Sequence, residues 1–259
     1  MSAALAYADP QFADGPGAPA VVTATELRRR YGEGDTAVDA LDGVDLVVAR
    51  GELTAVMGPS GSGKSTLMHL LAGLDRPTSG RVEIDGIDIT GLDDADLTKL
   101  RRSHVGFVFQ FFNLLPMLDA EENVTLPLAI AGEKPDGEWV GELMSRVGLA
   151  ERRKHRPSEL SGGQQQRVAV ARAVVSRPTV VFADEPTGNL DSRTGGEILD
   201  LLREAVEDYG QTLVMVTHDV RAAAIADRIV YLADGRIAKV AGRSTAAEIV
   251  AAVEAVSRQ

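Results

Sequence analysis

Hydrophobic residues in the first half of the chain gather in short runs that glycine or aspartate turns separate. Runs of this length and composition are typical of β-strands. The predicted strands cover residues 21–30, 44–49, 52–57, 81–85 and 105–109. In the second half, strand-like runs at 179–184, 212–218 and 228–234 alternate with helical spacing at 192–209 and 220–227. Such alternation indicates parallel strands joined by crossover helices, and therefore an α/β fold.

A different pattern lies between these two halves. From Asp119 to Leu160 the signals are helical or loop-like, and we expect Pro127, Pro135 and Pro157 to break the segment into pieces. The sequence therefore predicts a helical subdomain over about residues 113–167, inserted in a domain that spans residues 21–240.

The two ends of the chain lack the pattern of the central domain. Residues 1–20 mix Ala, Gly, Pro and Asp without periodicity, which predicts a disordered tail. Residues 241–259 include STAAEIVAAVEAVSRQ, whose spacing predicts an amphipathic surface helix with Ser244 or Thr245 as its N-cap. Neither segment points to a function.

Composition narrows the possible functions. The chain has 259 residues, of which 44% are hydrophobic, so it can bury a sizeable core. Its formal net charge of −11 argues against a general nucleic-acid surface, and we expect no nucleic-acid partner. The absence of cysteine excludes disulfides, thiolate metal sites and a cysteine nucleophile. No apolar run has bilayer-spanning length and the first residues lack the cationic region of a secretory signal, so we expect the chain to stay inside the cell.

Residues Gly58 to Ser65 read GPSGSGKS and match the P-loop pattern G-x-x-x-x-G-K-[ST]. They follow the predicted strand 52–57 and precede the helical run STLMHLLAG, which is the context that the motif requires. Glycines let backbone N–H groups wrap phosphates, Lys64 can reach the β and γ phosphates, and the Ser65 hydroxyl can ligate Mg²⁺. A nucleoside triphosphate site is therefore predicted, against the alternative of a glycine-rich turn.

The apolar strand 179–184 ends in two neighbouring carboxylates. Asp184 could hold Mg²⁺ directly or through water. Glu185, just beyond the strand end, could orient and polarise an attacking water. The competing interpretation is that the pair only caps a turn.

The stretch LSGGQQQR, residues 160–167, places a serine and two glycines before a run with helical spacing. Exposed N–H groups at the start of a helix attract an anion. One nucleotide hardly needs two such phosphate sites in one chain, so the second site calls for a separate explanation.

Four motifs together resemble the ATP-binding subunit of ABC transporters: the P-loop, LSGGQ, an apolar strand ending in Asp184-Glu185, and a later strand ending in Thr217-His218-Asp219. The resemblance covers roughly residues 23–240. It implies a P-loop NTPase with a RecA-like core, an antiparallel β subdomain and the inserted helical subdomain. It also implies ATP and Mg²⁺ as cofactors, ATP hydrolysis, and a peripheral position on the cytoplasmic face of the cell membrane.

In this family, two subunits lie head to tail and each ATP is held between the P-loop of one subunit and the LSGGQ of the other. The resemblance thus implies a second copy of this chain as a partner, and it assigns the second anion site to that partner's nucleotide. ATP would favour the closed dimer and ADP would not, because only ATP carries the γ phosphate.

The resemblance also implies roles for single residues. Gln110 would sense the metal and the water, His218 would touch the γ phosphate, Asp191 would bridge the subunits and Tyr31 would stack on adenine. Each has a plainer alternative: a surface amide, a packed neutral histidine, a helix N-cap and a core or rim tyrosine, respectively. Together with Glu185, we expect Gln110 and His218 to form the catalytic group.

The complete predicted site has a metal part and a nucleotide part. The expected metal ligands are Ser65, Gln110 and Asp184. The residues expected to bind ATP are Tyr31, Gly58, Pro59, Ser60, Gly61, Ser62, Gly63, Lys64, Ser65, Thr66, Ser161, Gly162, Gly163, Gln164 and Asp191.

The stretch FFNLLPMLDAEENVTLPLAIAG after Gln110 is apolar but interrupted by prolines, which is typical of a partner surface. In the family this region receives a short cytoplasmic helix of the membrane subunit. The resemblance implies that Phe111, Phe112, Leu114 and Leu115 line that groove; the alternative is that they belong to the core of the helical subdomain.

Several phrases, among them GFVFQFFNLLPMLDAEENV and ADEPTGNLDSRTG, look like the group of macrolide exporters, lipoprotein-release complexes and the cell-division pair. That likeness implies a permease of few membrane helices with a large extracytoplasmic domain, and we expect it to be a separate chain. The work done would be export, lipoprotein extraction or transmission of force. The alternative is a non-transport regulator of cell-wall or division enzymes. A soluble ABC protein of translation or DNA repair would usually carry two ATPase cassettes, or a coiled-coil or zinc-binding insertion. The sequence shows none of these features.

Overall fold

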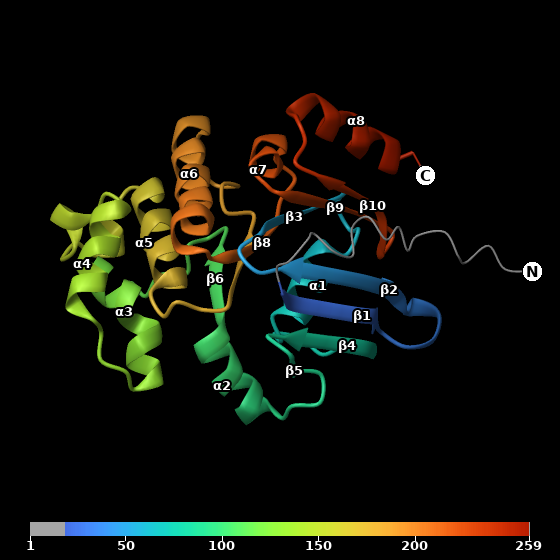
Figure 1. Ribbon diagram of the computed structural model, residues 1–259, viewed down its shortest axis with the longest axis horizontal. Helices are drawn as coiled ribbons and strands as arrows, with labels where there is room; N and C mark the ends of the chain where they lie inside the picture. The colour runs from blue at the N-terminus through green and yellow to red at the C-terminus, as the bar shows by residue number, and fades with distance from the viewer. Residues whose placement is uncertain (1–18, 259) are drawn as a thin grey trace, which may run out of the picture.

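A computed structural model describes residues 19–258 of the chain, shown in Figure 1. The predicted disordered tail therefore lies outside the described residues, apart from Pro19 and Ala20. Two β-sheets pack around α1, and most other helices cover the far face of the larger sheet (Figure 1). The mixed α/β architecture with an antiparallel sheet confirms the predicted fold class.

The larger sheet has the strand order β10-β9-β3-β8-β7-β6. All neighbouring pairs from β9 to β6 are parallel, and β10 alone runs antiparallel to β9. Strands β3 and β8 are buried along their whole length, as expected for central strands covered on both faces. The bounds are β3 Leu53–Met57, β6 Val105–Phe109, β7 Val180–Asp184, β8 Thr212–Val216, β9 Arg228–Ala233 and β10 Arg236–Gly242.

The smaller sheet is antiparallel, with the order β2-β1-β4-β5. Its inner face shares one core with helix α1 (Lys64–Leu71) and with one face of the larger sheet. Buried Leu67, Leu70 and Leu71 of α1 fill the space between the sheets. The strand bounds are β1 Ala20–Tyr31, β2 Val38–Ala49, β4 Ser79–Ile84 and β5 Ile87–Asp88.

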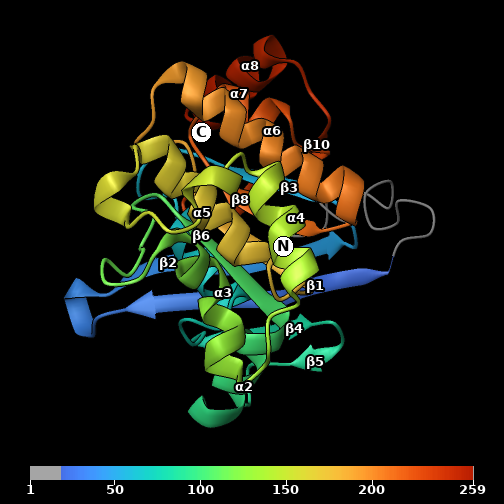
Figure 2. The same cartoon turned by 90° about the vertical axis from the view of Figure 1, so that its left-hand side faces the viewer.

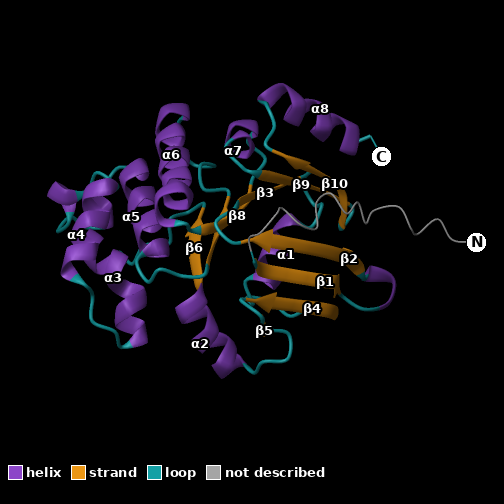
Figure 3. Cartoon of the chain, in the orientation of Figure 1, coloured by secondary structure: helices purple, strands orange, loops and turns teal. Residues whose placement is uncertain are grey.

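The remaining helices form the second core on the other face of the larger sheet, and Figure 2 brings α3, α4, α5 and α6 to the front. Helices α3, α4 and α5 all fall between β6 and β7 in the chain, and Figure 3 shows them grouped on one side of β6. The bounds are α2 Asp94–His104, α3 Ala120–Ala131, α4 Gly137–Arg146, α5 Gly162–Val174, α6 Ser192–Tyr209, α7 Val220–Ala224 and α8 Ala246–Val256, with 3₁₀ turns at Gly34–Thr36, Ala150–Arg152 and Pro157–Glu159.

Helix α3 corrects one prediction, because Pro127 lies inside it and does not break it. A proline within a helix removes one backbone hydrogen bond and costs about 3 kcal/mol. The helix persists because Asp119 and Glu122 form a capping box at its start, and because Val124 and Leu128 are buried in the core. Tertiary packing therefore overrides the local signal.

Three elements lie outside the predicted pattern: α2, β5 and β10. Strands β5 and β10 both return through two-residue Asp-Gly turns, at Asp85-Gly86 and Asp234-Gly235, with positive φ at all four residues. Such turns favour tight antiparallel hairpins. Strand β10 runs to Gly242, slightly past the predicted domain boundary, and Thr245 is the N-cap of α8.

Within the described part of the chain, none of the helices combines the length and the apolar character needed to cross a bilayer.

Candidate functional site

The register of the larger sheet aligns the ends of its central strands. One row of cross-strand neighbours joins Phe109, Asp184, Val216 and Val56. The segments that leave these strands therefore begin at the same edge, and backbone hydrogen bonds from Glu185 N to Val216 O (2.9 Å) and from Thr217 N to Val56 O (3.1 Å) extend the alignment. Ligands of open α/β sheets bind at this carboxyl edge.

The P-loop lies tightly against neighbouring backbone. A Cβ atom at Gly58 would overlap the carbonyl oxygen of Leu232, and one at Gly63 would overlap that of Ala40. Gly63 also has φ +100°, which disfavours any other residue. The hydroxyl of Ser62 is buried, with no hydrogen-bond partner among the described residues. A close backbone turn with a spare donor fits a bound phosphate.

Lys64 closes the loop from within. Its Nζ donates hydrogen bonds to the carbonyl oxygens of Gly58 (2.9 Å) and Pro59 (2.7 Å). Burial lowers the pKa of Lys64, while the charges of Glu185 and Asp184 oppose that shift. Both carboxylates thus act on this ammonium group, so the P-loop and the end of β7 form one electrostatic site.

Burial raises the pKa of Asp184, and the neighbouring Glu185 raises it further, while His69 and Lys64 oppose the shift. His69 was not among the predicted site residues. It lies on α1 four positions after Ser65, and residues at that spacing share a helix face, which is the signal that would have found it. A cation bound beside Asp184 would stabilise its ionised form.

Glu185 and His218 meet across the ends of β7 and β8. Nδ1 of His218 lies 2.8 Å from Oε1 of Glu185, and the Thr217 hydroxyl donates to Oε2 at 3.4 Å. Glu185 has φ +46°, a backbone conformation that is uncommon for a residue other than glycine. The carboxylate is 17% exposed and the imidazole 74%, so water can reach the pair from the histidine side.

Gln110 is bonded to the segment that follows Glu185. Its Nε2 donates to Oδ1 of Asn189 (3.3 Å), and Nδ2 of Asn189 donates back to the Gln110 carbonyl (3.0 Å). Asn189 was not among the predicted site residues; it belongs to the GNLD phrase, where only Asp191 was selected. Because Nε2 is used in this contact, the side-chain oxygen of Gln110 is the atom that would face a cation if the predicted metal role holds.

The predicted metal ligands Ser65, Gln110 and Asp184 offer oxygen atoms, the donor type that Mg²⁺ prefers. Among residues 19–258, no cluster of three or more His, Asp or Glu side chains could hold a metal ion unaided. The oxygen atoms of Ser65, Gln110 and Asp184 are the ones that would hold a Mg²⁺ ion.

The LSGGQ stretch opens α5 as predicted, with Ser161 as its N-cap. The Ser161 hydroxyl accepts from Gln164 N (3.3 Å), and the Gln164 side chain accepts from Ser161 N (2.9 Å), so these residues form a capping box. The glycines differ: Gly162 is exposed, whereas Gly163 is buried and a Cβ there would overlap the Thr194 methyl group. Gly163 thus brings α5 close to α6.

Asp191 and Tyr31 both have partners within the chain. Asp191 is the N-cap of α6, and the hydrogen bonds from Thr194 to its side chain hold the pKa of Asp191 below its ordinary value. The Tyr31 hydroxyl donates to Asp75 (2.7 Å), and the Arg29 guanidinium lies 4.4 Å from the ring centre. The subunit-bridging role of Asp191 and the adenine-stacking role of Tyr31 stay predictions.

The apolar stretch after Gln110 is divided between surface and core. Phe111 is 72% exposed and Leu115 is 40% exposed, whereas Leu114 packs against the main core and Phe112 is half-buried. Buried Asn123 fixes the loop: its Nδ2 donates to the carbonyls of Leu115, Leu118 and Asp119. The exposed side chains are therefore presented by a well-held backbone.

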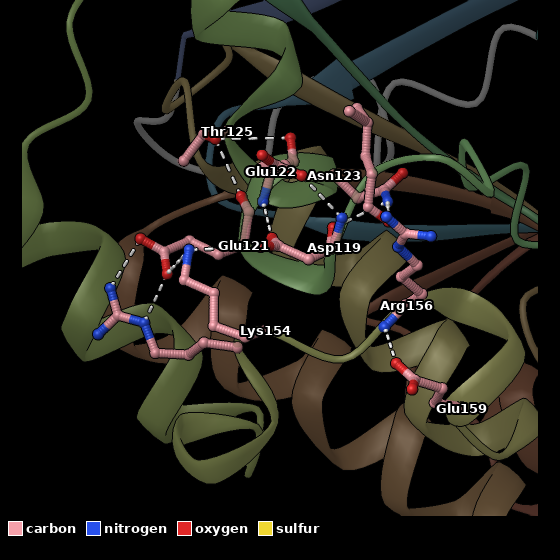
Figure 4. A network of polar contacts seen from close by, with 10 residues as sticks. Asp119, Glu121, Glu122, Asn123, Thr125, Lys154, Arg156 and Glu159 are labelled. Atoms are coloured by element: carbon pink, nitrogen blue, oxygen red, sulfur yellow. Dashed lines mark hydrogen bonds and ion pairs between the residues drawn. The ribbon is translucent and has the colours of Figure 1, made fainter.

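A polar network connects this loop to the residues that precede Ser161, as Figure 4 shows at Asp119, Glu121 and Lys154. Arg153 donates to both oxygens of Glu121, at 2.9 and 3.0 Å. Two backbone bonds, from Ala120 N to His155 O and from Glu121 N to Arg153 O, run parallel to these side-chain contacts. The start of α3 and the segment leading to α5 therefore form one unit.

Comparison with known proteins agrees with this geometry. Residues 41–188 match the ABC transporter family. The chain is 50% identical over 214 residues to the lipoprotein-releasing system ATP-binding protein LolD of Geobacter metallireducens, covering 82% of this chain and 95% of that protein. It is 48% identical over 231 residues to the macrolide export ATP-binding/permease protein MacB of Hyphomonas neptunium, covering 88% of this chain but only 36% of that longer protein.

A solved structure extends the likeness to three dimensions. It is the dimeric structure of a post-hydrolysis state of the ATP-binding cassette MJ0796, bound to ADP and Pi, and it superimposes with a TM-score of 0.78 at 43% identity. The match covers 86% of this chain and 99% of that one. The corresponding curated protein, from Methanocaldococcus jannaschii, is 48% identical over 218 residues, covering 82% of this chain and 92% of that protein. From its fold, its site and these relatives, the chain belongs to the ABC transporter family, within the group of LolD-like and MacB-like ATP-binding cassettes.

Proposed function

We propose that this chain binds Mg²⁺ and ATP, hydrolyses ATP at sites shared by two head-to-tail copies, and drives a separate membrane permease from the cytoplasmic face. The permease would have few membrane helices and a large extracytoplasmic domain. The work would be export, lipoprotein extraction or transmission of force.

The observation that carries the ATPase proposal is the convergence of Lys64, Asp184, Glu185 and His218 at one sheet edge. Lys64 supplies positive charge for the β and γ phosphates, and the neighbouring glycines supply backbone donors. Mg²⁺, when bound, neutralises phosphate charge. Ser65 and Asp184 would hold it, with Gln110 as a third oxygen donor.

Glu185 is the group that orients and polarises the attacking water. Its partly buried carboxylate accepts from the Thr217 hydroxyl at one oxygen and contacts His218 at the other, so its orientation is fixed on both sides. His218 in turn is exposed enough to reach a γ phosphate. A positioned carboxylate and an oriented water lower the barrier by pre-organisation.

Two observations support a site shared between copies. The glycines of the P-loop abut Leu232 and Ala40, whereas those of LSGGQ abut Phe112, Leu190 and Thr194, so the glycines of the two turns pack against different parts of the chain. In Figure 1, α5 and α1 lie on opposite sides of β6. Each copy would therefore offer its Ser161 end to its partner's nucleotide, as the dimeric form of the relative suggests.

Two measurements on the purified chain test the enzymatic half of this proposal. Phosphate release from Mg²⁺-ATP tests hydrolysis, and nucleotide titration tests the binding site. Lys64→Ala should weaken ATP binding by about tenfold or more, since a charge-assisted contact is worth roughly 1.5–3 kcal/mol. Lys99→Ala, the same change at an exposed lysine of α2 that pairs with Asp96, is the control. Equal ATP affinities for the two variants would contradict the assignment of the P-loop.

A further inference from the structure

The strand end that carries Gln110 is held on both sides by helix α5. Before Gln110, the carbonyl of Phe109 accepts from Nε2 of Gln166 (3.3 Å). After it, the carbonyls of Phe112 and Asn113 accept from Arg172, at 2.8 and 2.6 Å. The same helix begins at Ser161, so one rigid element connects the LSGGQ end to the backbone around Gln110.

Arg172 holds a strained turn. Phe112 has φ +58° and Asn113 has φ +50°. A non-glycine residue in this left-handed region costs about 1–2 kcal/mol, more readily tolerated by Asn than by Phe. The planar guanidinium presents Nη1 to one carbonyl and Nη2 to the other, a two-point contact that a lysine ammonium cannot reproduce. Arg172 therefore keeps both carbonyls turned towards α5.

The guanidinium group of Arg172 contacts only these two carbonyls among the side-chain hydrogen bonds of the described residues. Burial lowers the pKa of Arg172, and within residues 19–258 its side-chain hydrogen bonds go to backbone carbonyls. By contrast Arg167, five residues earlier on α5, donates to the Val147 carbonyl (2.9 Å) and also to Glu197 (2.8 Å). A half-buried arginine whose side-chain contacts are backbone carbonyls serves to fix that backbone.

Gln166 links the same strand end to the segment after Glu185. It is fully buried, and its Nε2 also donates to the Pro186 carbonyl at 2.6 Å. Its Oε1 has no partner among the described residues. The reverse amide orientation would set that oxygen against two carbonyls, so the donor side must face them. Gln166 thus keeps the Phe109 and Pro186 carbonyls at a fixed separation.

From these contacts we infer that Arg172 is a positioning residue: it fixes the turn at Phe112–Asn113 and thereby sets both the place of Gln110 at the metal and the presentation of the exposed side chains at 111 and 115. The role at the metal rests on the proposed ATPase function. The contact of Arg172 with the Phe112 and Asn113 carbonyls, called the Arg172 clamp below, does not rest on that function, because it lies within the chain.

The clamp is tested by spin labelling. The chain contains no cysteine, so Phe111→Cys gives one nitroxide site, at an exposed position next to the turn. In this labelled background, Arg172→Lys and Arg172→Gln should both narrow the electron paramagnetic resonance spectrum, which reports faster local motion. Arg172→Gln removes the charge altogether, so it still tests the contact if the lysine variant does not fold. Arg167→Lys, a matched change on the same helix, should leave the spectrum unchanged.

The role at the metal is tested by the Mg²⁺ dependence of ATP hydrolysis in the unlabelled chain. Loss of a residue that orients a metal ligand typically lowers metal affinity or activity by about 10- to 100-fold. Arg172→Lys should therefore raise the half-saturating Mg²⁺ concentration about tenfold, with the affinity for Mg²⁺-free ATP unchanged, because the P-loop is untouched. A merely structural defect would lower the folded fraction without moving the Mg²⁺ midpoint.

The outcomes separate the two claims. If the label moves no faster in the Arg172 variants than in Arg167→Lys, the Arg172 clamp is overturned. Faster label motion with an unchanged Mg²⁺ midpoint overturns the role at Gln110. If the unsubstituted chain hydrolyses no ATP, the proposed function fails, while the spin-label comparison still decides whether Arg172 holds the turn.

Discussion

Glu185 and His218 lie with Oε1 and Nδ1 2.8 Å apart at the carboxyl ends of neighbouring parallel strands. This contact joins the residue proposed to polarise water to the one proposed to touch the γ phosphate. Because the register of β7 and β8 fixes the two strand ends, the pair is set by the sheet and not by a flexible loop.

Changing Glu185 to Gln should slow ATP hydrolysis by about a hundredfold or more, the usual contribution of a positioned general base. The amide keeps the shape and the contact with Thr217 but loses the charged carboxylate. ATP binding should persist, and an ATP-bound dimer should accumulate on gel filtration. Glu204→Gln, the same change at an exposed glutamate of α6, should behave as the unsubstituted chain does. A Glu185→Gln variant that stays monomeric with ATP, while the unsubstituted chain hydrolyses it, contradicts the role.

Alanine at position 163 and alanine at position 162 should have different effects on the stability of the chain. Gly163→Ala places a methyl group on that of Thr194 and should destabilise the chain by about 1–3 kcal/mol. Gly162→Ala meets its nearest side chain at an ordinary 3.7 Å and should be neutral or stabilising by up to about 1 kcal/mol.

Urea unfolding measures both values. Adding Thr194→Ser to Gly163→Ala removes the clashing methyl while keeping the hydroxyl that bonds Asp191, and should restore most of the lost stability. If the double variant is no more stable than Gly163→Ala alone, close packing of α5 on α6 is not the reason for glycine at this position.

A comparison of Leu115→Arg with Leu114→Arg should distinguish a residue that binds the partner from one that supports folding. Leu115→Arg adds a charge at a half-exposed position, so the melting temperature and basal ATP turnover should be retained. The same change should abolish co-sedimentation with membranes that carry the permease. Leu114→Arg places a charge against the core and should cost more than about 3 kcal/mol of folding free energy. Unfolding of Leu115→Arg would assign that residue to the core instead.

The Glu121–Arg153 contact predicts a pH dependence of stability. The hydrogen bond from Arg153 is the main reason that the pKa of Glu121 lies below its ordinary value. A carboxyl whose folded pKa is lowered stabilises the fold fully above its unfolded pKa of about 4.5, and loses that contribution as the pH falls through the folded value. Glu121→Gln should therefore cost about 1 kcal/mol at pH 7, given partial exposure, and less as the pH falls below 4.5. A difference in unfolding free energy that stays constant from pH 7 to pH 3.5 would contradict this account.

The sequence predicted the central strands and the P-loop well because their signals are local. The run ELTAVM and the glycines that follow it specify a buried strand and a phosphate turn without reference to the rest of the chain. Helix α2 also has a readable signal, with Asp93 as N-cap and Leu97 and Leu100 on one face, although the predicted elements above include no helix between residues 85 and 105.

Other features depend on contacts that no local pattern contains. Gly163 requires Thr194 from another helix, and Arg172 requires a left-handed turn sixty residues earlier. An arginine within the apolar run from Val168 to Val175 carries no local signal of such a contact. Its purpose follows from where the carbonyls of Phe112 and Asn113 point, which the fold alone determines.

The shared ATP site is the central claim, and mixing two defective variants tests it most directly. Lys64→Ala and Ser161→Arg protomers, each labelled with a different fluorophore at a single introduced cysteine, should give almost no ATP-dependent energy transfer alone. In a head-to-tail mixed dimer, one site collects both defects while the other combines an intact P-loop with an intact LSGGQ. The account predicts that ATP raises energy transfer in the mixture. A mixture in which ATP does not raise energy transfer, under conditions in which unsubstituted protomers associate, would contradict the account.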